Sequence, residues 1–396
     1  MRVIHVSLAD FRNYAHAEVA LEPGPNLIIG RNGQGKTNLV EAIAYFASLR
    51  SHRVSSDAAL IRAGADTAVA RMRIGVNDRE ALLELEFNRN APNRAQVNRN
   101  AVRPREVTRW FATTVFAPED LLIVRGEPAV RRRFLDDALI ARNPAMSGVL
   151  SDYERVVRQR TALLKSARAS GARSALDATL GVWDDQLVSL GARIVSERRS
   201  LIAALRDPLG QSYRNLVEQD HGPRMRLDES FVSEAADVSR ETGAADDQLE
   251  RDGSVSRETL EAAFRETLAE LRAQEFERAV TLAGPHRDDL VFELNGLPVK
   301  GYASHGESWS FALSLRLAVA ELLRRESPAG DPVIILDDVF AELDAGRRAR
   351  LMAAVGDYEQ VIVTAAVEED IPAEMPWHRI RIAGGAVLAQ GGGTDG

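Results

Sequence analysis

The sequence contains no cysteine, only seven histidines and no long apolar run. The missing cysteines exclude disulfides, thiolate nucleophiles, iron–sulfur clusters and cysteine zinc sites. Since no two histidines have metal-ligand spacing, a zinc enzyme is not expected. Nowhere do roughly 18 apolar residues follow one another, and the N-terminal stretch MRVIHVSLADFRNY lacks the apolar core of a secretory signal. We therefore expect a soluble cytoplasmic protein without a membrane partner.

Lysine is also scarce, because 47 of the 50 basic residues are arginine and the lysines are Lys36, Lys165 and Lys300. The net charge of −8 comes almost entirely from residues 227–252, which hold nine acidic residues and two arginines. The other 370 residues sum to −1, so the acidic average does not exclude a nucleic-acid partner. The composition of 227–252 predicts a solvated loop or disordered insert, with an acidic interaction segment as the alternative.

Hydrophobic periodicity divides the chain into three zones, 1–117, 118–280 and 281–396. The first zone reads as short strands around one helix that begins near residue 38. The second is rich in Arg, Ala, Leu and Glu, and its spacing predicts long helices over 128–141, 146–171 and 175–218.

The third zone returns to alternating strands and helices. Asn295-Gly296 predicts a hairpin turn, because this dipeptide suits the positive φ angles of a type I′ turn. Helices are predicted over 306–325 and 344–354, with strands over 332–336 and 360–364. The tail after Pro372 is predicted to be frayed.

A complete phosphate-binding motif follows the apolar strand NLIIG of the first zone. The motif reads Gly30-Arg31-Asn32-Gly33-Gln34-Gly35-Lys36-Thr37 and is followed by Asn38. Its glycines let backbone N–H groups and a helix N-terminus face an anion. Lys36 is expected to contact the β and γ phosphates of ATP, and the Thr37 hydroxyl is expected to bind Mg²⁺. A glycine-rich turn that matches by chance is the alternative, but the strand before it and helix after it favour nucleotide binding.

The segment Val333-Ile334-Ile335-Leu336-Asp337-Asp338 supplies the acidic partner that such a loop needs. We expect Asp337 to hold the magnesium ion and Asp338 to polarise the attacking water. Alternatively, the two acids merely begin a loop after a core strand. About 300 residues separate Lys36 from Asp337, so the helical zone must be inserted into a nucleotide-binding core built from both chain ends.

This split core, with its phosphate loop and VIILDD segment, resembles the ABC-type ATPase heads of the SMC and Rad50 class. Four further stretches resemble the RecF family of bacterial recombinational repair, and this resemblance spans nearly the whole chain. The four stretches are DFRNY at 10–14, PEDLLIVRGEPAVRRRFLD at 118–136, GPHRDDL at 284–290 and DDVFAELD at 337–344. The resemblance implies an α/β ABC-type head formed by 1–117 and 281–396, with 118–280 as an inserted α-helical lobe.

The resemblance also implies roles for residues outside the two nucleotide motifs. Arg12 and Asn13 are expected near the nucleotide base or ribose. A signature motif around Ser304, Gly306 and Glu307 is expected to reach ATP bound to a second subunit, although Ser304 could simply cap a helix. Asp344 would face the partner subunit.

Two positions depart from the ABC pattern that the resemblance implies. Glu119 stands where ABC proteins have a glutamine. Thr364 stands where transporter ATPases have a histidine, so the way in which the γ-phosphate is sensed is left open.

Residues 88–133 hold ten arginines and four acids, which predicts salt-dependent DNA binding. The candidate contacts are Arg131, Arg132, Arg133, Arg103 and Arg105. Solvated surface charges or internal ion pairs are the alternative.

Together these features predict an ATP- and Mg²⁺-dependent homodimer that clamps double-stranded DNA at gaps or stalled forks, with slow, DNA-dependent ATP hydrolysis. The resemblance implies RecR and RecO as partners and assistance in loading RecA. A structural clamp with little turnover and a transporter ATPase subunit are the alternatives.

Overall fold

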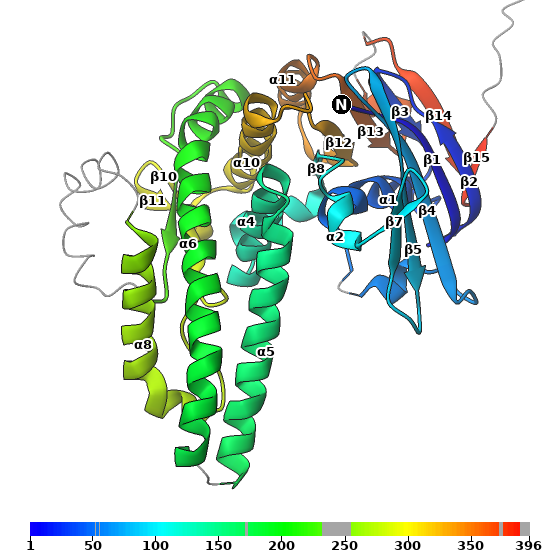
Figure 1. Cartoon of the computed structure of the whole chain (residues 1–396). Helices are drawn as coiled ribbons and strands as arrows, with labels where there is room; N and C mark the ends of the chain where they lie inside the picture. Colours follow the sequence, from blue (N-terminus) through cyan, green and yellow to red (C-terminus); the bar gives the residue numbers. More distant parts are fainter. Residues whose placement is uncertain (52, 55, 171–172, 232–254, 372–374, 389–396) are drawn as a thin grey trace, which may run out of the picture.

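The structure is a computed structural model that describes the chain except residues 52, 55, 171–172, 232–254, 372–374 and 389–396. An α/β head, built on two six-stranded sheets, lies beside an elongated helical lobe (Figure 1). Helix α10 (His305–Glu326) packs against both parts, because its buried residues belong to the apolar clusters of the lobe and of the head. The predicted ABC-type architecture is therefore confirmed.

The nucleotide motifs lie on a mainly parallel sheet with strand order β15-β14-β3-β13-β12-β8. Its strands are β3 (Gly24–Ile29), β8 (Thr113–Phe116), β12 (Val333–Asp337), β13 (Gln360–Ala365), β14 (His378–Ala383) and β15 (Ala386–Leu388). Every residue of β12 and β13 is buried, as expected for strands covered on both faces. Helix α11 (Ala345–Val355) connects β12 to β13. Since β3 pairs with β13 and β14, both ends of the chain build this sheet.

The second sheet of the head is antiparallel and has the order β2-β1-β4-β5-β6-β7. Its strands are β1 (Arg2–Phe11), β2 (Tyr14–Ala20), β4 (Thr67–Val76), β5 (Arg79–Asn88), β6 (Arg94–Val97) and β7 (Asn100–Val102). Helix α1 (Lys36–Ser48) shares one apolar cluster with both sheets, through buried residues such as Leu39 and Ile43. The short helices α2 (Pro104–Val107) and α3 (Leu121–Arg125) follow the antiparallel sheet and β8.

The lobe consists of four helices and a three-stranded sheet that share one apolar cluster. The helices are α4 (Pro128–Arg142), α5 (Met146–Ser170), α6 (Arg173–Val217) and α8 (Arg257–Arg278). The strands are β9 (Arg224–Asp228), β10 (Asp289–Leu294) and β11 (Leu297–Pro298), followed by the short helix α9 (Val299–Tyr302). The predicted long helices thus agree with α4, α5 and α6 to within a few residues. Among the described residues, no helix combines the length and apolar character that crossing a membrane requires.

Three details differ from the sequence-based prediction. The boundary expected at residue 280 divides a sheet, because β10 pairs with β9 of the preceding zone. Residues after Pro372 are not simply frayed, since β14 and β15 extend the head sheet. In both cases the deciding contact is with a strand far away in the sequence, which local patterns do not encode. Of the acidic segment 227–252, its start belongs to β9 and residues 232–252 lie outside the described residues.

Candidate nucleotide site

The phosphate loop connects the end of β3 to the start of α1, as its motif predicts. Two of its glycines have left-handed backbone angles, with φ of 78° at Gly33 and 121° at Gly35. A Cβ atom on Gly35 would also lie 2.8 Å from the Tyr14 hydroxyl oxygen. Gly35 is therefore required both by its backbone angle and by the close approach of the β1–β2 turn. The loop presents the N-terminus of a 13-residue helix, which is an anion-binding geometry.

The two predicted halves of the site meet in space. The Thr37 hydroxyl donates to Asp337 Oδ1 at 3.2 Å, and Lys36 Nζ lies 3.8 Å from Asp338 Oδ1. Lys36 and Asp337 are both buried. Burial raises the pKa of Asp337 to about 6, and the nearby carboxylates of Asp338 and Glu119 act in the same direction. The site thus has excess negative charge around a hydroxyl and two carboxylates, which suits a divalent cation.

Thr364 orders both acidic residues. Its hydroxyl donates to Asp337 Oδ1 at 2.6 Å and accepts a hydrogen bond from the Asp338 backbone N–H at 2.9 Å. The second bond holds Asp338 in a left-handed conformation with φ of 50°, which is unusual for a residue other than glycine. Thr364 is therefore a positioning residue for the two carboxylates, a role that the sequence pattern did not indicate.

The β1–β2 turn lies against the phosphate loop, as expected for Arg12 and Asn13. The Asn13 amide donates to Gln34 O at 3.0 Å and accepts from the amide of Asn38 at 2.7 Å. Arg12, Asn13 and Asn38 line an open cavity of about 510 Å³ beside the loop. This cavity has room for the base and ribose of a nucleotide whose phosphates lie in the loop.

Sequence reasoning missed Glu41, which fixes Arg12. The fully buried carboxylate of Glu41 accepts from Arg12 Nε at 2.8 Å and from Arg12 Nη2 at 2.7 Å. It also accepts from the hydroxyl of Ser51. The available signal was an acidic residue on an otherwise apolar helix, three positions after Asn38 and so on the same face.

The β14–β15 hairpin is a second feature that the sequence did not indicate. The backbone N–H of Gly384 donates to Gln34 Oε1, and that of Gly385 donates to Gln34 O at 3.0 Å. A Cβ on Gly30 would lie 2.4 Å from Ile382 O, so the loop and β14 are in close contact. The C-terminal part of the head therefore supports the phosphate loop directly.

The predicted signature motif begins α10. Ser304 is the N-cap residue: its hydroxyl accepts from the Glu307 N–H at 3.2 Å, and its own N–H donates to Glu307 Oε2 at 2.8 Å. This capping arrangement agrees with the simpler of the two sequence interpretations. Asp344 similarly caps α11 by accepting from the Arg347 N–H at 2.8 Å. The side chains of Arg347 and Gly306 are neighbours, because a Cβ on Gly306 would lie 3.0 Å from the Arg347 guanidinium.

Comparisons with known proteins agree with these features. The family model described as RecF/RecN/SMC N terminal domain matches residues 2–379. A DNA replication and repair protein RecF of Leifsonia xyli subsp. xyli is 58% identical, over 98% of this chain and 99% of its own length. The chain belongs to the RecF family. Another RecF relative, from Streptomyces avermitilis, is 48% identical over 98% of this chain and 99% of its own length.

Solved RecF structures share the fold of this RecF-family chain. A RecF-ATPrS structure of the RecFOR pathway has a TM-score of 0.83 and 25% identity, over 98% of this chain and 97% of that one. An SMC head bound to a ScpA domain has a TM-score of 0.52 at 14% identity, with 98% of each chain covered, and so shares the fold alone. The resemblance inferred from sequence is confirmed, and it replaces the transporter alternative.

Within this RecF-family fold, the arginines predicted to contact DNA have different surroundings. Arg131 is buried and donates to both carboxylate oxygens of Asp289, at 2.6 and 2.8 Å. It therefore offers no group to a ligand in this conformation, as the internal ion-pair alternative predicted. Arg132 and Arg133 are partly exposed on the same helix, α4, whereas Arg103 and Arg105 are exposed at α2.

Proposed function

We propose that this RecF-family chain is an ATP-dependent DNA-binding protein of recombinational repair. The observation that carries the proposal is the meeting of Lys36 and Thr37 with Asp337 and Asp338 across the interior of the head. The related RecF-ATPrS structure supports ATP as the nucleotide. Lys36, the loop N–H groups and the N-terminus of α1 would hold the phosphates, and the cavity beside Arg12 and Asn13 would take the base and ribose.

The residues around Thr37 fit a magnesium ion, which would neutralise charge on the phosphates. Its ligands would be the Thr37 hydroxyl and Asp337, directly or through water. At neutral pH the carboxyl group of Asp337 is largely ionised, because its pKa of about 6 lies below 7. Asp338 would orient the attacking water once it leaves Lys36, and its short side chain agrees with slow, DNA-dependent hydrolysis.

A second copy of the chain would complete the site. Ser304 and His305 are exposed at the N-terminus of α10, where backbone N–H groups can face a phosphate on another subunit. Asp344 is also exposed, at the start of α11. ATP held between two heads would therefore bring these groups onto each nucleotide and close a homodimer.

Duplex DNA would bind the closed dimer through arginines, at gaps or stalled forks. Arg103 and Arg105 are exposed beside Arg109, and the half-exposed ring of Trp110 follows them. Contacts of this kind bind phosphates largely independently of base sequence. RecR and RecO would act with this chain to assist loading of RecA, in keeping with the RecFOR pathway of its structural relative.

Sedimentation velocity tests the proposal, with and without ATP–Mg²⁺ and a short duplex. We expect dimers only with ATP, tighter DNA association in that state, and neither with Lys36→Ala. A protein that stays monomeric under every condition would refute the mechanism. Asp338→Asn should abolish turnover and retain the ATP- and DNA-bound dimer, so DNA release at the wild-type rate would contradict the assignment of Asp338.

The contact between Asp338 and Lys36 also favours a second candidate, an ATP-controlled structural clamp with little turnover. In this state the Asp338 carboxylate lies 3.8 Å from Lys36 Nζ, which leaves it less able to polarise water. Phosphate release measured with saturating DNA separates the two functions. DNA-stimulated turnover that disappears in Asp338→Asn supports the ATPase, whereas its absence in the wild type together with ATP-dependent dimerisation supports the structural clamp.

A further inference from the structure

A cleft of about 760 Å³ lies between the head and the lobe, and no step of the proposed function uses it. We call it the head–lobe cleft, and it is lined from the head by residues that include Arg50 and Asp57. The lobe lines it with Arg132, Arg133 and Asp136 of α4, with Tyr153 and Glu154 of α5, with Arg198 of α6, and with His286. Four arginines and three acidic residues therefore share one cleft.

The acidic residues of the cleft already have partners. Asp136 accepts from Arg198 Nη2 at 2.8 Å, and Glu154 lies 3.4 Å from Arg50 Nη2. Asp57 accepts from the amide of Asn93 at 2.8 Å. The GPHRDDL segment borders the cleft at His286, whose pKa burial lowers to about 4, so at neutral pH this imidazole adds no charge.

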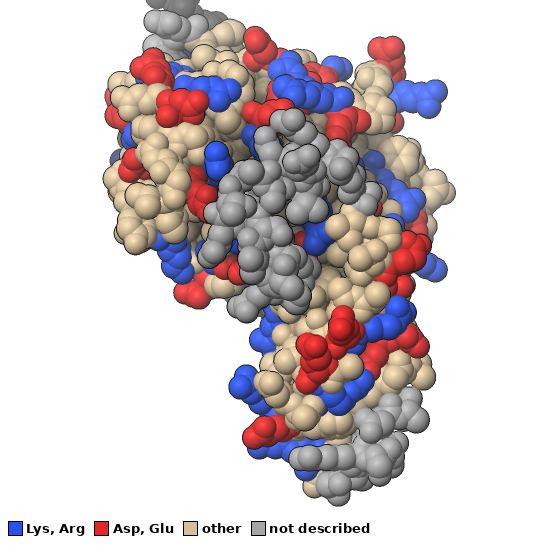
Figure 2. Space-filling view, turned by 90° about the vertical axis from the view of Figure 1, so that its left-hand side faces the viewer, with Lys and Arg blue, Asp and Glu red and all other residues tan. Residues whose placement is uncertain are grey.

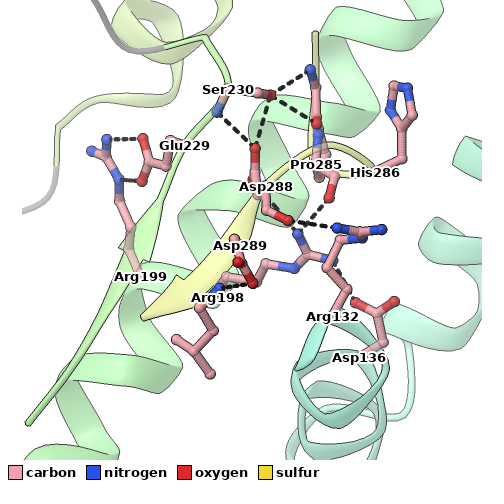
Figure 3. Close-up of polar contacts among 12 residues, drawn as sticks. Arg132, Asp136, Arg198, Arg199, Glu229, Ser230, Pro285, His286, Asp288 and Asp289 are labelled. Atoms are coloured by element: carbon pink, nitrogen blue, oxygen red, sulfur yellow. Dashed lines mark hydrogen bonds and ion pairs between the residues drawn. The ribbon is translucent and has the colours of Figure 1, made fainter. Parts of the chain in front are cut away.

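Arg132 and Arg133 retain positive charge that the protein does not balance. Arg132 Nη1 donates to the carbonyl oxygen of Asp288 at 2.8 Å, and no carboxylate of the described residues lies within 4.0 Å of its guanidinium. Arg133 donates to Ser51 O, and its nearest described carboxylate, that of Asp137, is 4.0 Å away. Figure 3 shows the Arg132 and Arg198 guanidinium groups side by side above the GPHRDDL segment.

Arg198 adds to the same local excess of positive charge. Its side chain is buried, and its Nε has no hydrogen-bond partner. Burial and the adjacent Arg198 both lower the pKa of Arg132. Two neighbouring guanidinium groups, one of them with an unpaired buried N–H, create a strong preference for an anion between them.

We propose that the head–lobe cleft is a second phosphate-binding site, in which Arg132 and Arg133 of α4 bind a phosphate group opposite Arg50 of the head. Guanidinium groups suit phosphate because their planar donors can bind two of its oxygens at once. The 13 residues of α1 separate this cleft from the phosphate loop, a helix length of roughly 20 Å. The cleft therefore cannot share the phosphates of a nucleotide in the loop.

The phosphate can come from a nucleic-acid backbone or from a free nucleotide. This inference rests on the proposed function only for the nucleic-acid source. The test combines Arg132→Gln and Arg133→Gln in the full chain and measures binding of a labelled 20-base-pair duplex at several salt concentrations. The Lys36→Ala protein, whose nucleotide site is disabled, is titrated with inorganic triphosphate with and without the two cleft substitutions.

Arg257→Gln with Arg265→Gln is the matched control. Both residues lie on α8, outside the cleft, and each is within 4.0 Å of Glu261. Figure 2 shows that basic and acidic side chains are interspersed along the lobe on the face that it displays, so this control removes the same charge from a mixed surface. Arg50→Gln on the head side is a second cleft variant that leaves the packing of α4 intact.

A nucleic-acid source predicts that the double cleft variant binds duplex about tenfold more weakly per lost contact near 0.1 M salt, with a shallower salt dependence. A free-nucleotide source predicts unchanged duplex binding but loss of triphosphate binding in the Lys36→Ala background. Arg50→Gln should weaken the same ligand, and the α8 control should weaken neither. If the folded cleft variants bind both ligands as their parent proteins do, the proposal is wrong. Failure of the wild type to bind duplex with ATP would instead refute the proposed function.

Discussion

Replacing Asp337 with asparagine should stabilise the nucleotide-free protein although it removes a residue of the site. Burial raises the pKa of this carboxyl group from 3.8 to about 6. Because the folded-state pKa lies above that of the unfolded chain, the carboxyl group favours folding below about pH 4 and loses that contribution as the pH rises through about 6. At about 1.4 kcal/mol per pKa unit, the ionised group costs the fold about 3 kcal/mol at pH 8. Asparagine keeps the Oδ1 acceptor for Thr37 and Thr364 without this charge.

Urea unfolding without nucleotide or magnesium measures the effect through tryptophan fluorescence, since Trp309 and Trp377 share the apolar cluster that includes β12. Asp337→Asn should gain about 3 kcal/mol at pH 8 and, from the same two pKa values, about 1.5 kcal/mol at pH 5. Asp185→Asn is the control, because this carboxylate is exposed and its loss should change stability by less than about 0.5 kcal/mol. A destabilised Asp337→Asn protein, or one whose gain does not depend on pH, would refute the reasoning. Adding ATP and magnesium should reverse the order of stability.

Three other substitutions test separate parts of the structure. Gly35→Ala should abolish ATP binding in equilibrium dialysis, because a Cβ there has no room, whereas Gly210→Ala in α6 meets nothing closer than 3.5 Å and should bind normally. Arg160→Gln should destabilise the lobe by about 3–5 kcal/mol in urea unfolding, since it leaves the buried Glu275 carboxylate without its charged partner; a loss below about 1 kcal/mol would contradict this. Glu41→Gln should raise the KM for ATP more than it lowers kcat, because it loosens the base and ribose side of the site. An unchanged KM in steady-state kinetics would exclude that role.

The parts of the nucleotide site that could be predicted are those encoded in contiguous motifs. A phosphate loop carries its own turn, helix start and ligands within a few residues, so Lys36 and Thr37 could be assigned without knowing the fold. Asp337 could be assigned because a run of buried strand residues ends at it. By contrast, Thr364 and Glu41 act through hydrogen bonds to residues that lie elsewhere in the sequence or on other elements, and each looks like an ordinary core position in isolation.

The three consecutive arginines of α4 show the same limit at the level of one helix. Successive residues of a helix point about 100° apart, so neighbours in the sequence cannot share one environment. Arg131 pairs with Asp289 in the interior, while Arg132 and Arg133 reach the cleft. Which residue turns inward is decided by β10, more than 150 positions away. Charge density alone therefore could not separate the internal ion pair from the available cations.

The position of β3 between β13 and β14 has a consequence for how the chain folds during synthesis. Ile29 and Gln360 are separated by about 330 residues, so at 5–20 residues per second the ribosome needs roughly 15–70 seconds to make the neighbours of β3. Helices α4 to α6 are contiguous and can pack long before that. The N-terminal part of the head must therefore wait with an unpaired β3 edge, which exposes it to chaperones and to wrong strand pairing. The phosphate loop can acquire its final support only after the last strands leave the ribosome.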